Sequence, residues 1–318
     1  MDPFPLLARL KNSSDTVLLA GAGGGYDVFC ALPLYFQLRS WGKEVILGNL
    51  SFSPIELMEG ERLTNEMLEV TAQTPMAGGS YFPEKFLCEW LDEQLGISSS
   101  IFCFERTGVA PICEAYEAVV DEHGVDTVVL VDGGTDSLMR GDEFGLGTPQ
   151  EDIASIAAAS MLELENKFLV CIGFGIDAFH GVNHCQFLEA VADLTKVGAF
   201  LGGGPLLKES EEARLYREAS EYVFDRMSHH PSIVNSSVLS AIDGEYGDFH
   251  ATHRTEGSKL WINPLMSLFW AFELDAVADR CLYLDAVRDT KSYARLTMAI
   301  EQFRAELDAT KPWEDIPV

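Results

Sequence analysis

Acidic residues gather in one short stretch of the sequence. Residues 131–152 read VDGGTDSLMRGDEFGLGTPQED and hold Asp132, Asp136 and Asp142 directly after an apolar run. Carboxylates crowded at the end of a buried strand repel one another by roughly 1 kcal/mol or more per close pair, so a cation is needed to relieve them. Oxygen ligands with flexible glycine spacing suit Mg²⁺ or another hard divalent cation. We predict Asp132 and Asp136 as catalytic residues, and these two with Asp142 as metal ligands.

A structural role is the alternative for this stretch. The first two aspartates can cap turns, and Arg140 is close enough in sequence to pair with Asp142. Thr148 precedes a predicted helix and is followed three residues later by Glu151, which is the pattern of a capping box. We favour the structural role for Thr148 and Glu151 and the functional role for the first two aspartates.

Glycines interrupt a second apolar run, where residues 16–29 read TVLLAGAGGGYDVF. A glycine turn between a strand and a helix exposes backbone N–H groups to a phosphate, and we predict this role for Gly23–Gly25. A dinucleotide site would place Gly or Ala at Tyr26 and an acidic residue at Asn49, so NAD is disfavoured. Asp27 can cap the helix, or can meet a ligand through a metal or a ribose hydroxyl. A tight corner without a ligand remains the alternative.

Two later polar stretches add groups of other chemistry. GFGIDAFHGVNH (173–184) holds His180 and His184 at helical spacing, but Gly181 replaces the glutamate of a zinc protease motif. We predict His180 as a general acid or base, with a helix cap or a buried hydrogen-bonding group as the alternative. In residues 244–267, Arg254 can clamp a phosphate or carboxylate with its planar fork, unless this loop is only solvated. The predicted ligand-binding residues are Gly23, Gly24, Gly25, Asp27, Gly133, Gly134, Thr135 and Arg254.

Composition limits the class of protein. The chain has 318 residues, of which 47% are hydrophobic and 23% charged, as in a globular protein with a large core. Its richest apolar run, PLMSLFWAFEL, contains Glu273 and is too short to span a membrane. The start does not read as a signal peptide, and seven scattered cysteines without a CxxC pair indicate a reducing compartment. We expect a cytoplasmic protein.

Charge limits the partners. A net charge of −28 disfavours nucleic acids and anionic membranes, because both are polyanions. Residues 1–50 carry no net charge, with four acidic and four basic residues. An anionic small molecule would therefore meet the least repulsion at the first glycine turn. A homo-oligomer and a monomer both remain open.

Apolar runs alternate with helical patterns through the first two hundred residues. Fully apolar strands of this kind belong to a parallel sheet with helices on both faces, so we predict a Rossmann-like, doubly wound α/β fold with a helical C-terminal layer or cap. The predicted units are a sheet domain over 1–204 and a helical region over 205–318 packed on it, or a single domain. We expect strands over 16–22, 44–52, 99–105, 126–132, 167–175 and 197–203, helices over 27–41, 110–123, 149–164, 184–196 and 208–227, and mostly helix over 264–309.

Four motifs resemble the domain-of-unknown-function 1152 family of archaea and bacteria: GAGGGYDV, VDGGTDSLMRGDE, GFGIDAFHG and WINPLMSLFWAFEL. The resemblance spans about residues 15–300 and implies one Rossmann-like unit with a helical C-terminal part. It implies no catalytic residue. Tyr26 and Phe29 depart from the small residues expected there, which would narrow or alter the ligand site.

Three functions fit these residues. The first is an enzyme that hydrolyses or transfers a group of a phosphorylated or nucleotide-like small molecule, with Mg²⁺ or another divalent cation assisting. The second is a sensor that binds a nucleotide or metabolite without turnover. The third, an NAD(P)-dependent oxidoreductase, is the weakest because of Tyr26 and Asn49.

Overall fold

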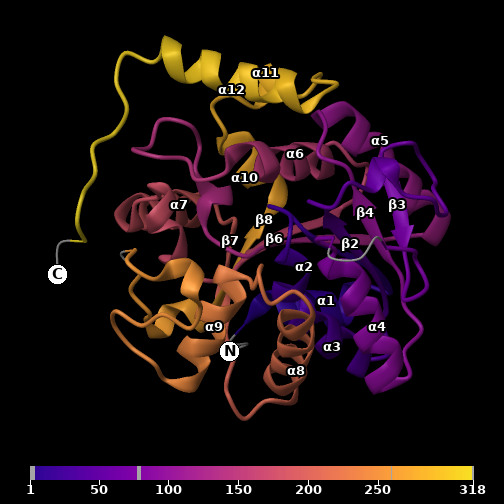
Figure 1. Cartoon of the computed structure of the whole chain (residues 1–318). Coiled ribbons are helices and arrows are strands. Elements are labelled where there is room, and N and C mark those ends of the chain that lie inside the picture. Colours follow the sequence, from indigo (N-terminus) through magenta and orange to yellow (C-terminus); the bar gives the residue numbers. More distant parts are fainter. Residues whose placement is uncertain (1–3, 77–79, 259, 317–318) are drawn as a thin grey trace.

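The computed structural model describes residues 4–76, 80–258 and 260–316, and these fold around one sheet (Figure 1). Five strands in the middle of the sheet are parallel, and antiparallel pairs complete its two edges. The strands are β1 (Thr16–Gly21), β2 (Glu44–Leu50), β3 (Met67–Val70), β4 (Ile101–Phe104), β5 (Thr127–Asp132), β6 (Asn166–Cys171), β7 (Phe200–Pro205) and β8 (Leu268–Glu273). Their order across the sheet is β3-β4-β2-β1-β5-β6-β8-β7.

Helices cover both faces of the sheet, and a separate hydrophobic cluster fills the space under each layer. One layer consists of α1 (Pro5–Ser13), α2 (Asp27–Cys30), α3 (Leu32–Ser40), α4 (Pro83–Leu95), α8 (Glu211–Arg226) and α9 (Ile233–Asp243). The other consists of α5 (Val109–His123), α6 (Pro149–Ser160), α7 (His184–Lys196), α10 (Leu274–Arg280), α11 (Leu284–Val287) and α12 (Tyr293–Glu306). The sheet with two helical layers confirms the predicted Rossmann-like α/β fold.

The parallel strands are almost wholly buried, which explains their continuous apolar sequences. The central pair, β1 and β5, lies side by side, with Gly21 of β1 in register with Val131 of β5. From this pair the chain continues through β2 and β4 on one side and through β6 on the other. The direction of winding therefore reverses between β1 and β5, and the loops that leave their carboxyl ends diverge and open a crevice there.

The prediction of helix throughout residues 264–309 was wrong in its first part. Residues 268–273, LFWAFE, form β8, which lies antiparallel between β6 and β7. A short apolar run fits a buried helix and a buried strand equally well, and its aromatic residues here favour the strand. Because β8 pairs with β6 and β7, residues on both sides of 204 share one sheet.

Three further elements, namely α1, β3 and α4, were not predicted, and one predicted helix is divided. The antiparallel edge strand β3 and the helix α4 occupy a region in which the sequence pattern indicated only an acidic segment. The helix predicted over 27–41 is divided at Ala31 into α2 and α3, with Pro33 in the first turn of α3. Among the described residues, no helix combines the length and the apolar character that crossing a bilayer demands.

Candidate functional site

A cleft of about 430 Å³ opens at the carboxyl ends of β1 and β5. The loops that follow these strands and β6 supply most of its wall, and the segment before α9 closes the opposite side. Its position at the point where the winding reverses is where doubly wound folds bind ligands. The residues that line it are Gly23, Gly24, Gly25, Tyr26, Asp27, Phe52, Tyr81, Asp132, Gly133, Asp136, Thr148, Asp152, Asp177, His180, His230, Ser232, Ile233, Val234 and Arg254.

Five buried aspartates meet in this cleft. Asp27 follows β1, Asp132 ends β5, Asp136 lies in the loop after it, Asp152 is in the first turn of α6, and Asp177 follows β6. None of the five forms an ion pair with any described residue. Buried carboxylates are costly unless a partner compensates them, so this cluster suits a ligand that brings positive charge.

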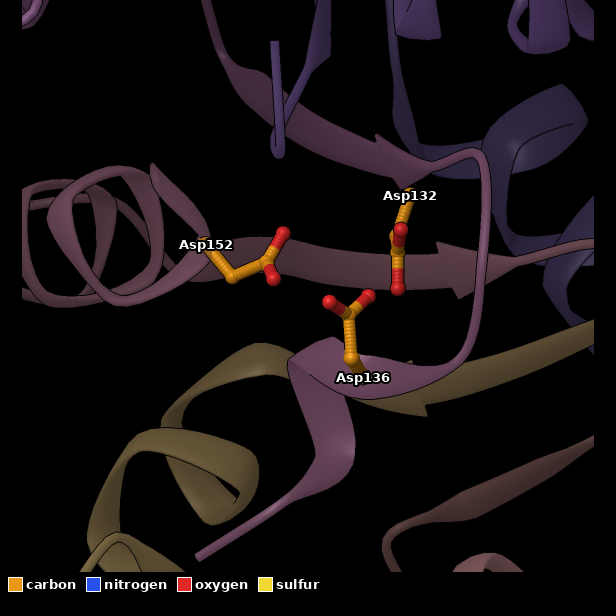
Figure 2. A group of neighbouring side chains, drawn as sticks. All are labelled: Asp132, Asp136 and Asp152. Carbon is orange, nitrogen blue, oxygen red and sulfur yellow. The ribbon is translucent and has the colours of Figure 1, made fainter. Parts of the chain in front are cut away.

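Three of the aspartates lie close enough together that they could hold one metal ion. Asp132, Asp136 and Asp152 each offer a carboxylate oxygen such that the three oxygens lie within 4.8 Å of one another. Figure 2 shows the three side chains pointing toward a common space from β5, from the loop after it and from α6. Converging oxygen ligands at this separation suit a hard divalent cation such as Mg²⁺.

Asp152 provides independent evidence of a missing partner. Its side chain is 2% exposed, and neither of its carboxylate oxygens has a hydrogen-bond partner among the described residues. Buried polar groups are almost always paired, and an unpaired one indicates a bound water or ion outside the polypeptide. Since the carboxylate of Asp152 points toward Asp132 and Asp136, a cation between the three satisfies all of them.

The other four aspartates share one pattern of anchoring. In each, Oδ2 accepts a hydrogen bond from a backbone N–H, and Oδ1 takes no part in that bond. Such anchoring fixes each carboxylate, and the N–H groups of Gly24 and Gly133 also face that of Asp27 and lower its pKa. The donors to Oδ2 are the Gly23 N–H for Asp27, the Ser137 N–H and hydroxyl for Asp132, the Thr148 N–H and hydroxyl for Asp136, and the Thr135 N–H and hydroxyl for Asp177.

Burial and mutual repulsion shift the titration of the cluster. Burial raises the pKa of Asp27 to about 7, against the lowering effect of the Gly23 N–H, and the charge of Asp136 raises it further. Burial also holds the pKa values of Asp132, Asp152 and Asp177 well above the ordinary value, and the charge of Asp136 again adds to the shift. Without a cation the cluster therefore retains protons near neutral pH.

The glycines of the cleft make room for these carboxylates. A Cβ atom at Gly23 would lie 2.6 Å from Asp152 Oδ1 and 2.9 Å from Asp27 Oδ2. One at Gly133 would lie 2.6 Å from Asp27 Oδ1, and one at Gly134 would lie 2.7 Å from Asp177 Oδ2. These are closer than side-chain atoms approach, so each glycine allows one or two aspartates to reach the cleft.

The three N–H groups expected to cradle a phosphate at the first glycine turn all face acceptors within the protein. The Gly23 N–H donates to Asp27 Oδ2, and the Gly25 N–H donates to the carbonyl of Leu50. The Gly24 N–H also faces the carboxylate of Asp27, whose pKa it lowers. A phosphate in this cleft therefore needs a cation as well as the turn.

Replacing Gly23 tests the steric role of the turn. We expect Gly23→Ala to lower the free energy of unfolding by about 1–3 kcal/mol, because its Cβ overlaps two fixed carboxylates. We also expect the variant to lose the rise in melting temperature that a divalent cation gives the parent. Gly96→Ala is the control for the cation response: its Cβ meets no atom within 4 Å, and although its φ of 64° strains an alanine and lowers stability, the cation response should stay that of the parent. An unchanged cation response in Gly23→Ala would show that the turn does not shape the cluster.

Asp142, predicted as a metal ligand, lies outside the cluster. Its carboxylate pairs with Arg140 at 2.6 Å and with Lys311 at 3.6 Å, as in the structural alternative. The C-terminal segment holds this loop from outside, since Arg304 donates to the carbonyls of Gly141 and Glu143, and the Lys311 N–H donates to the carbonyl of Asp142.

The predicted capping box is wrong. The Thr148 side chain does not cap α6 and donates its hydroxyl to Asp136, while Glu151 accepts from the Tyr293 hydroxyl. Thr148 therefore orients a candidate ligand at the start of the helix, where a cap was expected.

The predicted cationic groups occupy the outer part of the cleft. His180 and Arg254 are exposed and line it with His230, and Arg254 also donates to the carbonyl of Pro231 at 2.7 Å. His184 does not join His180 on one helix face, because α7 begins only at His184. The buried carboxylates thus lie at the bottom of the cleft, and the exposed basic residues His180, His230 and Arg254 form its rim.

Two residues of the cluster were missing from the prediction. Asp152 ends the acidic stretch 131–152, and Asp177 lies in the glycine-containing turn before His180. A signal for Asp177 exists in the sequence, because this residue follows a predicted parallel strand as Asp132 does. Asp152 lies on a helix, and only the packing of α6 against the sheet turns it into the cleft.

Comparison with known proteins assigns the chain to one protein family over nearly its full length. A family model described as "Protein of unknown function (DUF1152)" matches residues 18–309. No curated protein and no solved structure matches the chain. Since the family model covers nearly the full length, the chain belongs to the DUF1152 family.

Proposed function

We propose that this protein is an enzyme that hydrolyses or transfers a group of a phosphorylated small molecule with the help of a divalent cation. The observation that carries the proposal is Asp152, buried and unpaired beside Asp132 and Asp136. A cation held by these three would bring the phosphate into a cleft that otherwise repels it. It would also polarise a phosphoryl oxygen during the reaction.

The rim supports the same chemistry. Arg254 would balance the charge on the phosphate oxygens, because a guanidinium binds such oxygens in pairs. In hydrolysis, a water oxygen bonds to phosphorus and gives up a proton to solvent while the ester P–O bond breaks, and the leaving oxygen takes up a proton. His180 lies at the rim and would supply that proton as a general acid.

Turnover with a defined set of phosphate esters tests this function. We expect release of inorganic phosphate from at least one sugar phosphate, nucleotide or alkyl phosphate in Mg²⁺ or Mn²⁺, and its loss in EDTA. Adding the cation back restores the rate, because the carboxylates remain folded without it. Binding without turnover would instead identify a sensor, and absence of both binding and turnover with every cation would contradict the proposal.

A further inference from the structure

We infer that the substrate is a phosphorylated sugar, either free or as the sugar phosphate of a nucleotide, and that Asp27 and Asp177 bind its hydroxyl groups. This inference rests on the proposed function and adds the substrate class. It starts from the aspartates that the cation does not use. The triad of Asp132, Asp136 and Asp152 accounts for one ion, whereas Asp27 and Asp177 line the same cleft beside it.

The charge of the cleft decides what a substrate must offer. One divalent cation offsets two of the five carboxylates, and no described basic side chain pairs with the remainder. A phosphate ester adds further negative charge, so the rest of the molecule has to donate hydrogen bonds to carboxylate oxygens. Hydroxyl groups on adjacent carbons do this without adding charge, and hydrogen bonds to charged acceptors are the strong ones.

The geometry of the two aspartates fits this use. Each is buried, with Asp27 at 9% and Asp177 at 8% exposure, and each is fixed through Oδ2 by a backbone N–H at 2.7 Å. Their Oδ1 atoms lie beside consecutive glycines, because a Cβ at Gly133 would be 2.6 Å from Asp27 Oδ1 and one at Gly134 would be 3.0 Å from Asp177 Oδ1. Two fixed acceptors beside one turn match neighbouring hydroxyls on one ring.

An apolar wall completes the site. The ring of Phe52 is 40% exposed, lines the cleft and lies over the glycine turn, where a Cβ at Gly24 would be 2.5 Å from it. Sugars present C–H groups on the faces of the ring that carry no hydroxyl, and these pack against aromatic side chains. In this arrangement the cation would bind the phosphate, the two carboxyl groups would bind the hydroxyls, and the ring of Phe52 would pack against the C–H groups of the sugar.

Binding of three probes in Mn²⁺, measured by calorimetry, tests the inference. Ribose 5-phosphate and AMP carry ribose hydroxyls, whereas n-pentyl phosphate has a chain of similar length without any. We expect n-pentyl phosphate to bind at least tenfold more weakly than the better of the other two. Asp177→Asn should weaken the hydroxylated probe by about 10- to 100-fold, because the amide puts an N–H donor in place of one of the two carboxyl oxygens, and should leave n-pentyl phosphate within about threefold.

The outcomes separate the two proposals. If ribose 5-phosphate binds more tightly than AMP, the substrate class is a free sugar phosphate. If AMP binds more tightly, the substrate class is a nucleotide. Either result supports the inference. Equal binding of all three probes, or equal weakening of all by Asp177→Asn, overturns the inference and leaves the proposed function standing. Failure of every probe to bind overturns the inference, and the proposed function falls with it only if every phosphate ester of the turnover test also remains uncleaved. Asp27→Asn provides a second variant if Asp177→Asn does not fold.

Discussion

Asp152→Asn is expected to abolish cation binding while stabilising the protein that contains no cation. In the parent, Mn²⁺ at about one hundred times its dissociation constant should add about 2.7 kcal/mol to the free energy of unfolding. For a chain of 318 residues this corresponds to a rise of about 4 °C in the melting temperature. The variant removes the only aspartate of the triad with both oxygens free, so we expect its affinity for Mn²⁺ to fall about 100-fold or more.

The expected stabilisation of Asp152→Asn in the absence of a cation distinguishes this result from simple misfolding. Without a cation, Asp152→Asn removes one of several crowded buried carboxyl groups, which relieves roughly 1 kcal/mol or more of repulsion at a pH where the cluster is ionised. We therefore expect its melting temperature in EDTA to equal or exceed that of the parent. Asp142→Asn is the matched control, because Asp142 lies on the same loop but pairs with Arg140 outside the cluster.

Melting curves of both variants in EDTA and in Mn²⁺ provide the measurement. A parent-like rise in Asp152→Asn, or an equal loss in Asp142→Asn, would remove Asp152 from the candidate site. Loss of turnover should accompany the loss of cation response in Asp152→Asn. Turnover in Asp142→Asn should remain within about twofold of the parent.

The second large effect is a fall in stability between pH 4 and pH 7 in the protein without a cation. The pKa of Asp27 is raised to about 7 by burial, whereas in the unfolded chain it stays near 4. The folded protein thus binds more protons than the unfolded chain in this range. The contribution of Asp27 to the free energy of unfolding is therefore largest below pH 4 and falls as the pH rises. One such carboxyl costs about 1.4 kcal/mol for each pH unit crossed.

Urea unfolding in EDTA at pH 5, 6 and 7 measures this slope. Asp132, Asp152 and Asp177, whose pKa values are also raised by burial, act in the same direction. Asp27→Asn should reduce the slope, because it removes one of the groups that bind protons in this range. Saturating Mn²⁺ should reverse it, since cation binding requires deprotonated ligands and becomes stronger as the pH rises. A parent stability independent of pH in EDTA would contradict the burial of these groups.

Much of the fold follows from the sequence because buried parallel strands carry their own signature. Continuous apolar runs such as those of β1 and β5 are typical of strands covered on both faces, and the glycines that follow them mark the carboxyl edge of the sheet. Asp132 and Asp136 could be assigned to the site for the same reason. β8 could not be predicted, because a six-residue apolar run has the same pattern in a helix and in a strand.

The role of the glycines could not be read from their spacing. Gly23 and Gly133 occur where a phosphate-binding turn would place them, but their space is taken by Asp152 and Asp27. These contacts join segments more than one hundred residues apart, so no local pattern reports them. Asp152 was missed for the same reason, since which face of α6 meets the cleft is set by tertiary packing.

The attachment of the C-terminal segment determines when the site can form during synthesis. Arg304 and Lys311 hold the loop 141–147, and this loop leads directly to Thr148, which orients Asp136. Chains fold from the N-terminus as they leave the ribosome, so the five strands of the parallel sheet are available long before these two residues emerge. The parallel strands can thus pair before the loop that leads to Thr148 and Asp136 is held in its final position.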